Sequence, residues 1–280
     1  MRGKVCLVTG ATSGIGDCTA LGLAHKKATV ILVGRSEKKC IETVSRIQSE
    51  TNNAQVGYLV CDLSSQTDIR RLVSEFKDQY SRLDVLVNNV GGAFWRRTLS
   101  EDGLEMTFAL NHLSYFLLTN LLLDELNQGS GARVVNVSSG SHKRHRLDFN
   151  DLQLSKNYNV VEAYGQSKLA NVLFTYELHR RLNSKSVTAN VMSPGLVSTP
   201  IWKNSAPGLG PFLAWCIRLF AQTPQEGAEA VIYLASSPDV EGISGKYFRK
   251  KVMTKSAPQT YNIESAKRLW EISEQMTGLV

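Results

Sequence analysis

The chain has 280 residues, 42% of them hydrophobic, which is enough to bury a large core and is compatible with one α/β domain. The formal net charge is +7, but the basic residues fall in dispersed clusters without interleaved aromatic side chains, so nucleic acid is not expected as a partner. Five cysteines without metal-ligand spacing and the lack of a run of about 18 apolar residues argue against a disulfide framework, a metal site and a transmembrane helix.

The first predicted elements are a strand near residues 4–9, a glycine-rich turn and a helix. Gly10 would permit the tight turn, Gly14 would let the backbone approach a pyrophosphate, and Gly16 would let the helix pack closely on the strand. The helix N-terminus would offer N–H groups and a positive dipole end to phosphates. The residues expected to bind a dinucleotide here are Gly10, Thr12, Ser13, Gly14, Ile15 and Gly16.

The end of the second predicted strand, near residues 28–33, indicates which dinucleotide binds. An NAD site needs a carboxylate just past this strand to accept from the ribose 2′-hydroxyl, and this chain has Gly34-Arg35 instead. An arginine can hold a 2′-phosphate with paired, charge-assisted hydrogen bonds. We therefore predict NADP(H), with Ser36 adding to the phosphate pocket; the alternative is that Arg35 is an ordinary surface arginine.

Further apolar runs predict strands near residues 55–60, 84–88, 132–138, 186–192 and 245–248. Helical patterns lie between them, and the stretch Leu113–Leu126 predicts one long core or interface helix. Alternation of this kind predicts an α/β Rossmann fold, in which a doubly wound parallel sheet carries helices on both faces. We expect residues 1–280 to form a single domain.

Tyr164 and Lys168 are four positions apart in a predicted helix, so their side chains would lie on one face, one turn apart. A free tyrosine hydroxyl has a pKa of about 10, which is too high for efficient proton exchange near neutral pH. A nearby ammonium favours the phenolate and lowers that pKa. The pair is therefore a candidate acid/base.

Together these segments resemble the short-chain dehydrogenase/reductase family almost from end to end. The first turn is similar to the family motif T-G-x-x-x-G-x-G, and the later segments occur in the family's order and at its spacing. The matching segments are Thr9–Gly16, Asp62-Leu63, Asn88-Asn89-Val90-Gly91, Asn111, Val135–Ser139, Tyr164 with Lys168, and Pro194-Gly195 with Thr199.

The resemblance implies a catalytic role for four residues. Tyr164 would donate the proton in carbonyl reduction and accept it in alcohol oxidation, while Lys168 would lower the tyrosine pKa and hold the nicotinamide ribose. Ser139, rather than Ser138, would bind the substrate oxygen, because it stands 25 positions before Tyr164 as in the retinol-dehydrogenase-like branch. Asn111 would position a water that links Lys168 to solvent.

The resemblance also implies contacts with the cofactor beyond the first turn. Asp62 would accept a hydrogen bond from the adenine, and the loop after residue 193 would cover the nicotinamide. The residues that the resemblance assigns to these contacts are Asp62, Leu63, Asn89, Gly91, Tyr164, Lys168, Pro194, Gly195, Val197 and Thr199.

The stretch Tyr164–Leu182 is most similar to the retinol-dehydrogenase-like branch, which implies a small lipophilic alcohol or carbonyl substrate. Residues 196–222 form a family-variable, apolar-rich region that would serve as a substrate lid or as a patch that dips into a bilayer surface; the alternative is an ordinary amphipathic helix packed on the core. Ser114-Tyr115 departs from the branch pattern, so a broader reductase of lipophilic aldehydes, ketones or steroids is equally consistent. The candidate pocket walls are Phe94, Trp95, Tyr158 and Trp202.

The resemblance implies a homodimer formed through the helices that contain Asn111 and Tyr164. We expect a cytoplasmic protein or one in peripheral contact with an intracellular membrane, not a secreted one, because Arg2-Gly3-Lys4 leads directly into the first strand. Since NADP(H) pools are usually reduced, we expect carbonyl reduction. Two alternatives remain: an NAD-linked dehydrogenase for a small polar substrate, and a non-catalytic dinucleotide sensor or scaffold.

Overall fold

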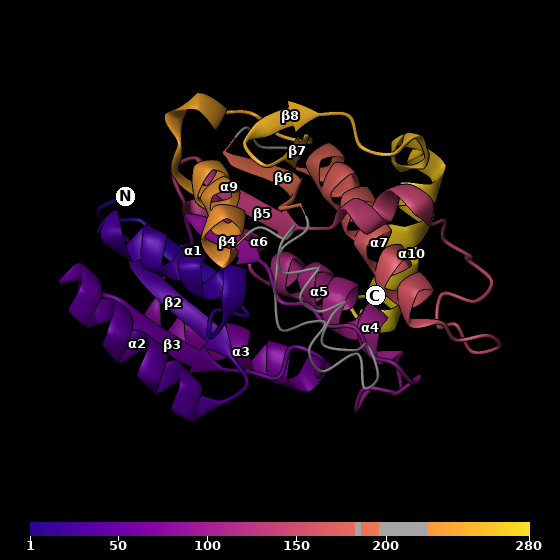
Figure 1. Cartoon of the computed structure of the whole chain (residues 1–280), viewed down its shortest axis with the longest axis horizontal. Helices are drawn as coiled ribbons and strands as arrows, with labels where there is room; N and C mark the ends of the chain where they lie inside the picture. Colours follow the sequence, from indigo (N-terminus) through magenta and orange to yellow (C-terminus); the bar gives the residue numbers. More distant parts are fainter. Residues whose placement is uncertain (183–185, 196–222) are drawn as a thin grey trace, which may run out of the picture.

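The computed structural model describes residues 1–182, 186–195 and 223–280. Within these ranges eight strands form one sheet in the order β3-β2-β1-β4-β5-β6-β7-β8 (Figure 1). All neighbouring pairs are parallel except β7 and β8. The strands are β1 (Val5–Thr9), β2 (Thr29–Gly34), β3 (Val56–Val60), β4 (Val85–Asn88), β5 (Ala132–Val137), β6 (Val187–Ser193), β7 (Tyr247–Arg249) and β8 (Val252–Thr254).

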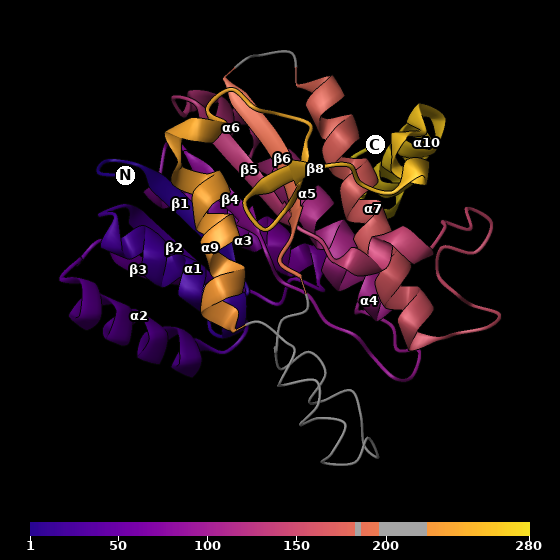
Figure 2. The ribbon, with the colours of Figure 1, turned by 45° about the horizontal axis from the view of Figure 1, so that its top comes forward.

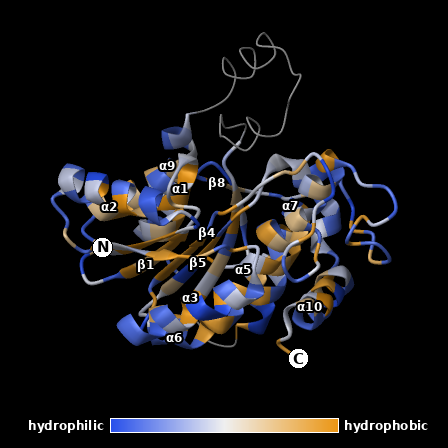
Figure 3. Ribbon diagram, turned by 90° about the horizontal axis from the view of Figure 1, so that it is seen from below, coloured by the Kyte–Doolittle hydropathy of each residue, from blue (hydrophilic) through white to orange (hydrophobic). Residues whose placement is uncertain are grey.

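Helices cover both faces of the sheet, as Figure 3 shows with the apolar strands between two helical layers. One layer contains α1 (Gly14–His25), α2 (Glu37–Thr51) and α9 (Pro224–Ser236). The opposite layer contains α3 (Gln66–Gln79), α5 (Ser114–Leu121), α6 (Leu123–Gln128) and α7 (Val160–Arg181). This is the doubly wound, mostly parallel α/β fold that the sequence predicts, in a single domain.

The alternation of side chains along β1 explains why both faces need cover. Cys6 and Val8 contact the α1 layer, whereas Leu7 contacts the α3 layer, and all three are fully buried. Strands that are buried on both faces read as continuous apolar runs, which is why the sequence marks the inner strands β1, β2, β4, β5 and β6 so clearly. The strand β8 was not predicted, because its three residues are all exposed and carry no burial pattern.

The helix predicted over Leu113–Leu126 is interrupted. The chain forms a short α4 (Met106–Phe108), a π-helical turn η1 (Ala109–Leu113), then α5, and a break at Leu122 before α6. Apolar periodicity cannot distinguish these forms, because a π-helical turn and an α-helix bury similar side chains. Such turns occur frequently at functional sites, and this one contains Asn111.

The C-terminal helix α10 (Ile263–Thr277) lies along the outer side of α7, as Figures 1 and 2 both show. Its Trp270 is 5% exposed and packs against Phe116 of α5 and Phe174 of α7, with ring centroids 4.9 and 5.8 Å apart. At its far end, Gln66 and Arg70 of α3 each donate to a backbone carbonyl of the last turn. The helix therefore braces one layer of the domain.

The lid predicted over residues 196–222 lies outside the described residues, and so do the predicted site residues Val197, Thr199 and Trp202. In the described ranges, no helix combines the length and the apolar character needed to cross a membrane.

Candidate active site

The glycine-rich turn between β1 and α1 has the geometry that a dinucleotide-binding turn needs. Gly10 and Gly14 both adopt positive φ angles, +63° and +60°, which other residues rarely adopt. A Cβ added to Gly16 would lie only 2.3 Å from the carbonyl oxygen of Gly10, so a larger residue cannot fit. These three glycines let the helix begin directly against the end of the strand.

Hydrogen bonds between Thr9, the last residue of β1, and the residues at and after the end of β4 brace this turn. The Thr9 hydroxyl donates to the Val87 carbonyl and accepts from the backbone N–H groups of Asn89 and Val90. The Asn89 amide in turn donates to the Thr9 carbonyl at 2.9 Å. Asn89, which the family resemblance assigns to the cofactor, thus fixes the turn; direct contact with a cofactor stays a prediction.

The N-terminus of α1 can hold phosphates. Ser13 is exposed at the cap position and its hydroxyl does not cap the helix, so the first-turn N–H groups are oriented outward without that partner. Thr12 lies beside Gly34 at the end of β2, where a Cβ on the glycine would come within 2.7 Å of the threonine methyl group. Ile15 is 8% exposed and packs in the core, so only its backbone can face a ligand.

Arg35 follows β2 directly, and its side chain is exposed beside the turn. Among the described residues it forms no ion pair with a carboxylate. Ser36 is the N-cap residue of α2, and its hydroxyl makes no capping bond. The Arg35 guanidinium and the N–H groups of the first turn of α2 could therefore bind a 2′-phosphate.

Asp62 and Leu63 form the turn after β3. The Asp62 carboxylate is exposed, and its Oδ1 accepts from both the backbone and the hydroxyl of Ser64. Leu63 is 4% exposed and packs in the core on the α3 side of the sheet. The carboxylate therefore has a structural task, while Oδ2 accepts no hydrogen bond from within the described residues.

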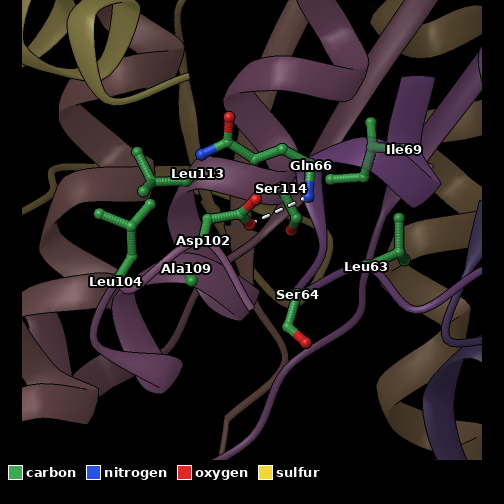
Figure 4. Close-up of a pocket in the computed structure, with 9 residues that line it drawn as sticks. All are labelled: Leu63, Ser64, Gln66, Ile69, Asp102, Leu104, Ala109, Leu113 and Ser114. Carbon is green, nitrogen blue, oxygen red and sulfur yellow. Dashed lines mark hydrogen bonds between the residues drawn. The ribbon is translucent and has the colours of Figure 1, made fainter. Parts of the chain in front are cut away.

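A small pocket lies behind this turn (Figure 4), where the backbone N–H of Gln66 donates to Asp102 at 3.1 Å. Its volume of about 10 Å³ holds roughly one water molecule, so neither a nucleotide nor a substrate fits there. The lining residues are Leu63, Ser64, Gln66, Ile69, Asp102, Leu104, Ala109, Leu113 and Ser114.

The catalytic candidates of α7 meet the end of β5. Tyr164 and Lys168 are buried on the inner face of α7, and the ammonium nitrogen of Lys168 lies 5.8 Å from the centre of the Tyr164 ring. The Ser139 side chain hydrogen-bonds the Tyr164 side chain. Three residues that are up to 29 positions apart in sequence therefore converge on one point.

The pKa values within this cluster differ from the sequence-based expectation. Burial raises the pKa of the Tyr164 phenol above its usual value, and the hydrogen bond with Ser139 only partly opposes that effect. Burial also lowers the pKa of the Lys168 ammonium to about 7. Because Lys168 is itself desolvated, it does not carry the full charge near neutral pH that would lower the pKa of Tyr164.

Asn111 reaches the same cluster from η1. Its amide pairs with the backbone of Gly92 through two hydrogen bonds of 2.8 and 2.9 Å, and it also donates to the Ser167 hydroxyl. A Cβ on Gly91 would lie 3.3 Å from the Lys168 nitrogen and 3.4 Å from Asn111 Oδ1. The backbone of Gly91 thus packs closely against the side chains of both Asn111 and Lys168.

The two neighbouring serines after β5 have different partners. The Ser138 hydroxyl is buried and donates to the Lys168 carbonyl at 2.7 Å, so it ties β5 to α7. The Ser139 hydroxyl points toward Tyr164 and accepts from the backbone N–H of Ser141. This division agrees with the choice of Ser139 as the serine at the reacting centre.

The remaining predicted residues lie around this centre. Gly195 has a φ of +96° and follows Pro194 at the end of β6. The Tyr158 hydroxyl donates to the carbonyl of Phe94, which joins two of the candidate pocket walls, and Trp95 beside them is 46% exposed.

Sequence reasoning missed several residues that support the cluster. The hydroxyl of the buried Tyr115 donates to the Val90 carbonyl, and its ring lies 5.5 Å from the Lys168 nitrogen. The Asn171 amide donates to the Asn111 carbonyl, and His142 contacts the Ser139 carbonyl. No motif marks these side chains, because their hydrogen bonds go to backbone carbonyls around the cluster.

Comparisons with known proteins agree with this geometry. The family model described as short chain dehydrogenase matches residues 4–209. The human protein named polyprenol dehydrogenase is 44% identical over 286 residues, covering 99% of this chain and 86% of that protein. Mouse retinol dehydrogenase 14 is 41% identical over 295 residues, covering 100% and 87%.

Among solved structures, the Pseudomonas aeruginosa RhlG/NADP active-site complex superposes with a TM-score of 0.73. The two chains are 26% identical, and the match covers 89% of this chain and 95% of the other. The matched family model, the identity of the relatives and the convergence of Tyr164, Lys168 and Ser139 lead to one conclusion. The chain belongs to the short chain dehydrogenase family of oxidoreductases.

Proposed function

We propose that this protein is an NADP(H)-dependent oxidoreductase that reduces a lipophilic aldehyde or ketone to its alcohol. The observation that carries the proposal is the convergence of Tyr164, Lys168, Ser139 and Asn111 at the end of β5, next to a phosphate-binding turn. A buried proton donor beside a nucleotide site is what carbonyl reduction requires.

The cofactor site fits NADP(H) on the chain's own features. The turn Gly10–Gly16 and the N-terminus of α1 would hold the pyrophosphate, Arg35 and Ser36 the 2′-phosphate, and Asp62 the adenine. Lys168 makes one hydrogen bond within the described residues, to the Val137 carbonyl, so its other N–H groups can hold the ribose. Bound here, NADPH would supply the hydride for the carbonyl carbon.

The roles of the chain's residues follow from their environments. The raised pKa of Tyr164 keeps its phenol protonated at neutral pH, which suits the donation of a proton to the substrate oxygen. Ser139 would hydrogen-bond the same oxygen and stabilise the charge that develops on it. Lys168, with a pKa of about 7, can return a proton to Tyr164 after each turnover.

The proposed substrate class rests on the relatives and on the pocket walls. The relatives named polyprenol dehydrogenase and retinol dehydrogenase 14 carry the names of lipophilic alcohols. Phe94, Trp95 and Tyr158 lie beside the end of β4 and the start of α7 and would line an apolar entrance. An apolar entrance would favour an extended hydrocarbon chain over a small polar carbonyl.

We further propose peripheral contact with an anionic membrane surface. Strand β8 exposes Val252 and Met253, 67% and 53% respectively, directly after the basic run Arg249–Lys251. Exposed apolar and cationic side chains together favour the interface of an anionic bilayer. Cosedimentation with phosphatidylserine vesicles, but not with phosphatidylcholine vesicles, is the expected result; binding to neither would contradict it.

The proposed function is tested by titrating the purified protein with NADPH and NADH side by side and then assaying carbonyl substrates. We expect NADPH to bind at least about tenfold tighter, which corresponds to about 1.4 kcal/mol. With NADPH, long-chain aldehydes and retinaldehyde should be reduced faster than small polar aldehydes. Tighter binding of NADH would favour the NAD-linked alternative, and binding of neither would favour a non-catalytic role.

A further inference from the structure

The position of Ser139 is not fixed by the strand that precedes it. The last hydrogen bond of β5 on this side runs from the backbone N–H of Ser138 to Met192, and Ser139 then leaves the sheet. The following turn, Gly140–Arg144, is a single 3₁₀ turn, and its first residue has no atom within 4 Å of a would-be Cβ. The backbone N–H groups of the turn hold Ser139 by only two long hydrogen bonds, from Ser141 to the Ser139 hydroxyl at 3.3 Å and from His142 to the Ser139 carbonyl at 3.2 Å.

The side chain of His142 joins this turn to a C-terminal segment, residues 256–261. Its imidazole is fully buried, with Nδ1 at 2.6 Å from the Ser139 carbonyl and Nε2 at 3.3 Å from the backbone nitrogen of Ala257. A backbone N–H can only donate, so Nε2 is the acceptor and Nδ1–H donates to Ser139. The ring also packs on Tyr247, with centroids 5.0 Å apart.

A second tether comes from the same C-terminal segment. The Gln259 side-chain amide donates to the carbonyl of His145, the residue directly after the turn, at 2.9 Å. The His145 ring in turn covers Gly165, where a Cβ would lie within 2.1 Å of the ring, so the loop is seated beside Tyr164.

The segment that supplies these tethers is itself anchored to α7. The hydroxyls of Tyr176 and Ser256 lie 2.7 Å apart, and the Ser256 backbone N–H donates to the Tyr261 hydroxyl. The side chains of Tyr176 and Tyr261 stack with centroids 5.6 Å apart. Residues 256–261 therefore connect the loop that contains Ser139 to α7, the helix that carries Tyr164.

We propose that His142 and Gln259 are positioning residues for catalysis: His142 holds the backbone of Ser139, and Gln259 holds the turn that follows it, so that the Ser139 hydroxyl meets the hydroxyl of Tyr164. The inference rests on the proposed function, because it assumes that Ser139 and Tyr164 act on the substrate. Neither His142 nor Gln259 touches the reacting atoms, so both act through Ser139.

Three substitutions at His142 separate its two hydrogen bonds. Asparagine places an amide nitrogen near the position of Nδ1 and keeps the bond to Ser139, glutamine reaches toward Ala257 instead, and phenylalanine removes both bonds. With NADPH and a long-chain aldehyde, we expect His142→Phe and His142→Gln to lower kcat roughly tenfold or more, and His142→Asn to stay within about threefold of the parent. The affinity for NADPH should change less than about twofold in all three, since the imidazole of His142 bonds Ser139 and Ala257, neither of which is assigned to the cofactor.

A double-mutant cycle tests whether His142 acts through Ser139. In a Ser139→Ala background, His142→Phe should cost little further activity, because the hydroxyl that it positions is already absent. Gln259→Ala, at a half-buried position, should show a smaller loss of kcat than His142→Phe. His25→Asn and Gln79→Ala, at exposed positions on α1 and α3, serve as controls and should match the parent.

Three results would overturn the proposal: a His142→Phe or His142→Gln enzyme with full kcat, equal losses in the parent and Ser139→Ala backgrounds, or losses that follow the melting temperature alone across all variants. Ser139→Ala and Tyr164→Phe are measured in the same assay. If these two keep full turnover, the proposed function fails; if they lose it while the His142 variants keep theirs, only the positioning role fails.

Discussion

At the scale of single residues, we expect the exposed Arg35 side chain to determine the preference for NADPH over NADH. An Arg35→Ala variant loses the charge-assisted bonds to a 2′-phosphate, and NADH has no such group. We therefore expect its dissociation constant for NADPH to rise about tenfold or more, while that for NADH changes less than about twofold. Fluorescence titration of both nucleotides measures this, with Arg2→Ala, exposed before β1, as the control. Unchanged NADPH affinity in Arg35→Ala would remove the argument for NADP(H).

The buried Lys168 makes a prediction about stability and pH. Its folded pKa is about 7, whereas the unfolded side chain titrates near its ordinary value of 10.5. Between these values the unfolded state binds more protons, so raising the pH favours the folded state. Without nucleotide, the free energy of unfolding of the parent, relative to that of Lys168→Met, should rise by about 2 kcal/mol from pH 7.5 to 9.5.

Urea denaturation at the two pH values measures this difference, and the comparison with Lys168→Met cancels the contribution of other groups. Lys267→Met, at an exposed position on α10, should show the pH dependence of the parent. A parent and a Lys168→Met variant with the same pH dependence would show that Lys168 titrates normally and is not desolvated.

Which site residues the sequence could reveal depends on what each residue does. Glycines at positive φ and polar residues with motif spacing, such as Gly10, Gly14 and Tyr164, leave a pattern in the sequence. The shifted pKa values of Tyr164 and Lys168 leave no such pattern, because the segments that bury these two side chains are distant in the sequence. No motif in the sequence marks His142, whereas the structure buries it against the Ser139 backbone.

At the scale of elements, the contact between α1 and the end of β1 depends on Gly16. Gly16→Ala would place a Cβ 2.3 Å from the Gly10 carbonyl oxygen, so the helix must move away from the turn. We expect a loss of about 1–3 kcal/mol in the free energy of unfolding. A large loss of NADPH affinity should accompany it, since the N–H groups move with the helix.

Thermal unfolding and nucleotide titration check both effects. The matched control is Gly57→Ala in β3, where an added Cβ meets no atom within 4 Å, and it should match the parent in both measurements. A Gly16→Ala protein that binds NADPH as well as the parent would show that the close approach of helix and turn is not needed for binding.

The first six parallel strands could be predicted because each reads as an apolar run, and all but the half-buried edge strand β3 are covered on both faces. The π-helical turn η1 and the antiparallel β8 could not. The form of η1 depends on hydrogen bonds from Asn171 and from the Gly92 backbone to Asn111, and these come from other segments. The pairing of β8 is set by its turn rather than by burial.

At the scale of the whole molecule, Trp270 is one of the buried side chains that attach α10 to the domain, together with Ala266 and Leu269. Its ring contacts Phe116 and Phe174, and the Arg181 guanidinium lies 4.4 Å from its centre. Trp270→Ala should lower the free energy of unfolding by about 3–5 kcal/mol, because it opens a cavity between α5, α7 and α10. Trp95→Ala, at a 46% exposed position, should cost less than about 1 kcal/mol.

Chemical denaturation of the two variants measures these costs. Equal stability of Trp270→Ala and the parent would mean that α10 does not brace the domain. A homodimer through the helices of Asn111 and Tyr164 stays a prediction, and because α10 covers the outer side of α7, such a dimer would have to include α10 in its interface.

The central claim is that Tyr164 donates the proton in NADPH-dependent reduction of a lipophilic carbonyl. The most direct measurement compares the rate of NADPH oxidation with a long-chain aldehyde for the parent and for Tyr164→Phe, after both have been shown to bind NADPH equally. We predict turnover by the parent and a loss of at least about 100-fold in kcat for Tyr164→Phe. Full turnover by Tyr164→Phe would contradict the account.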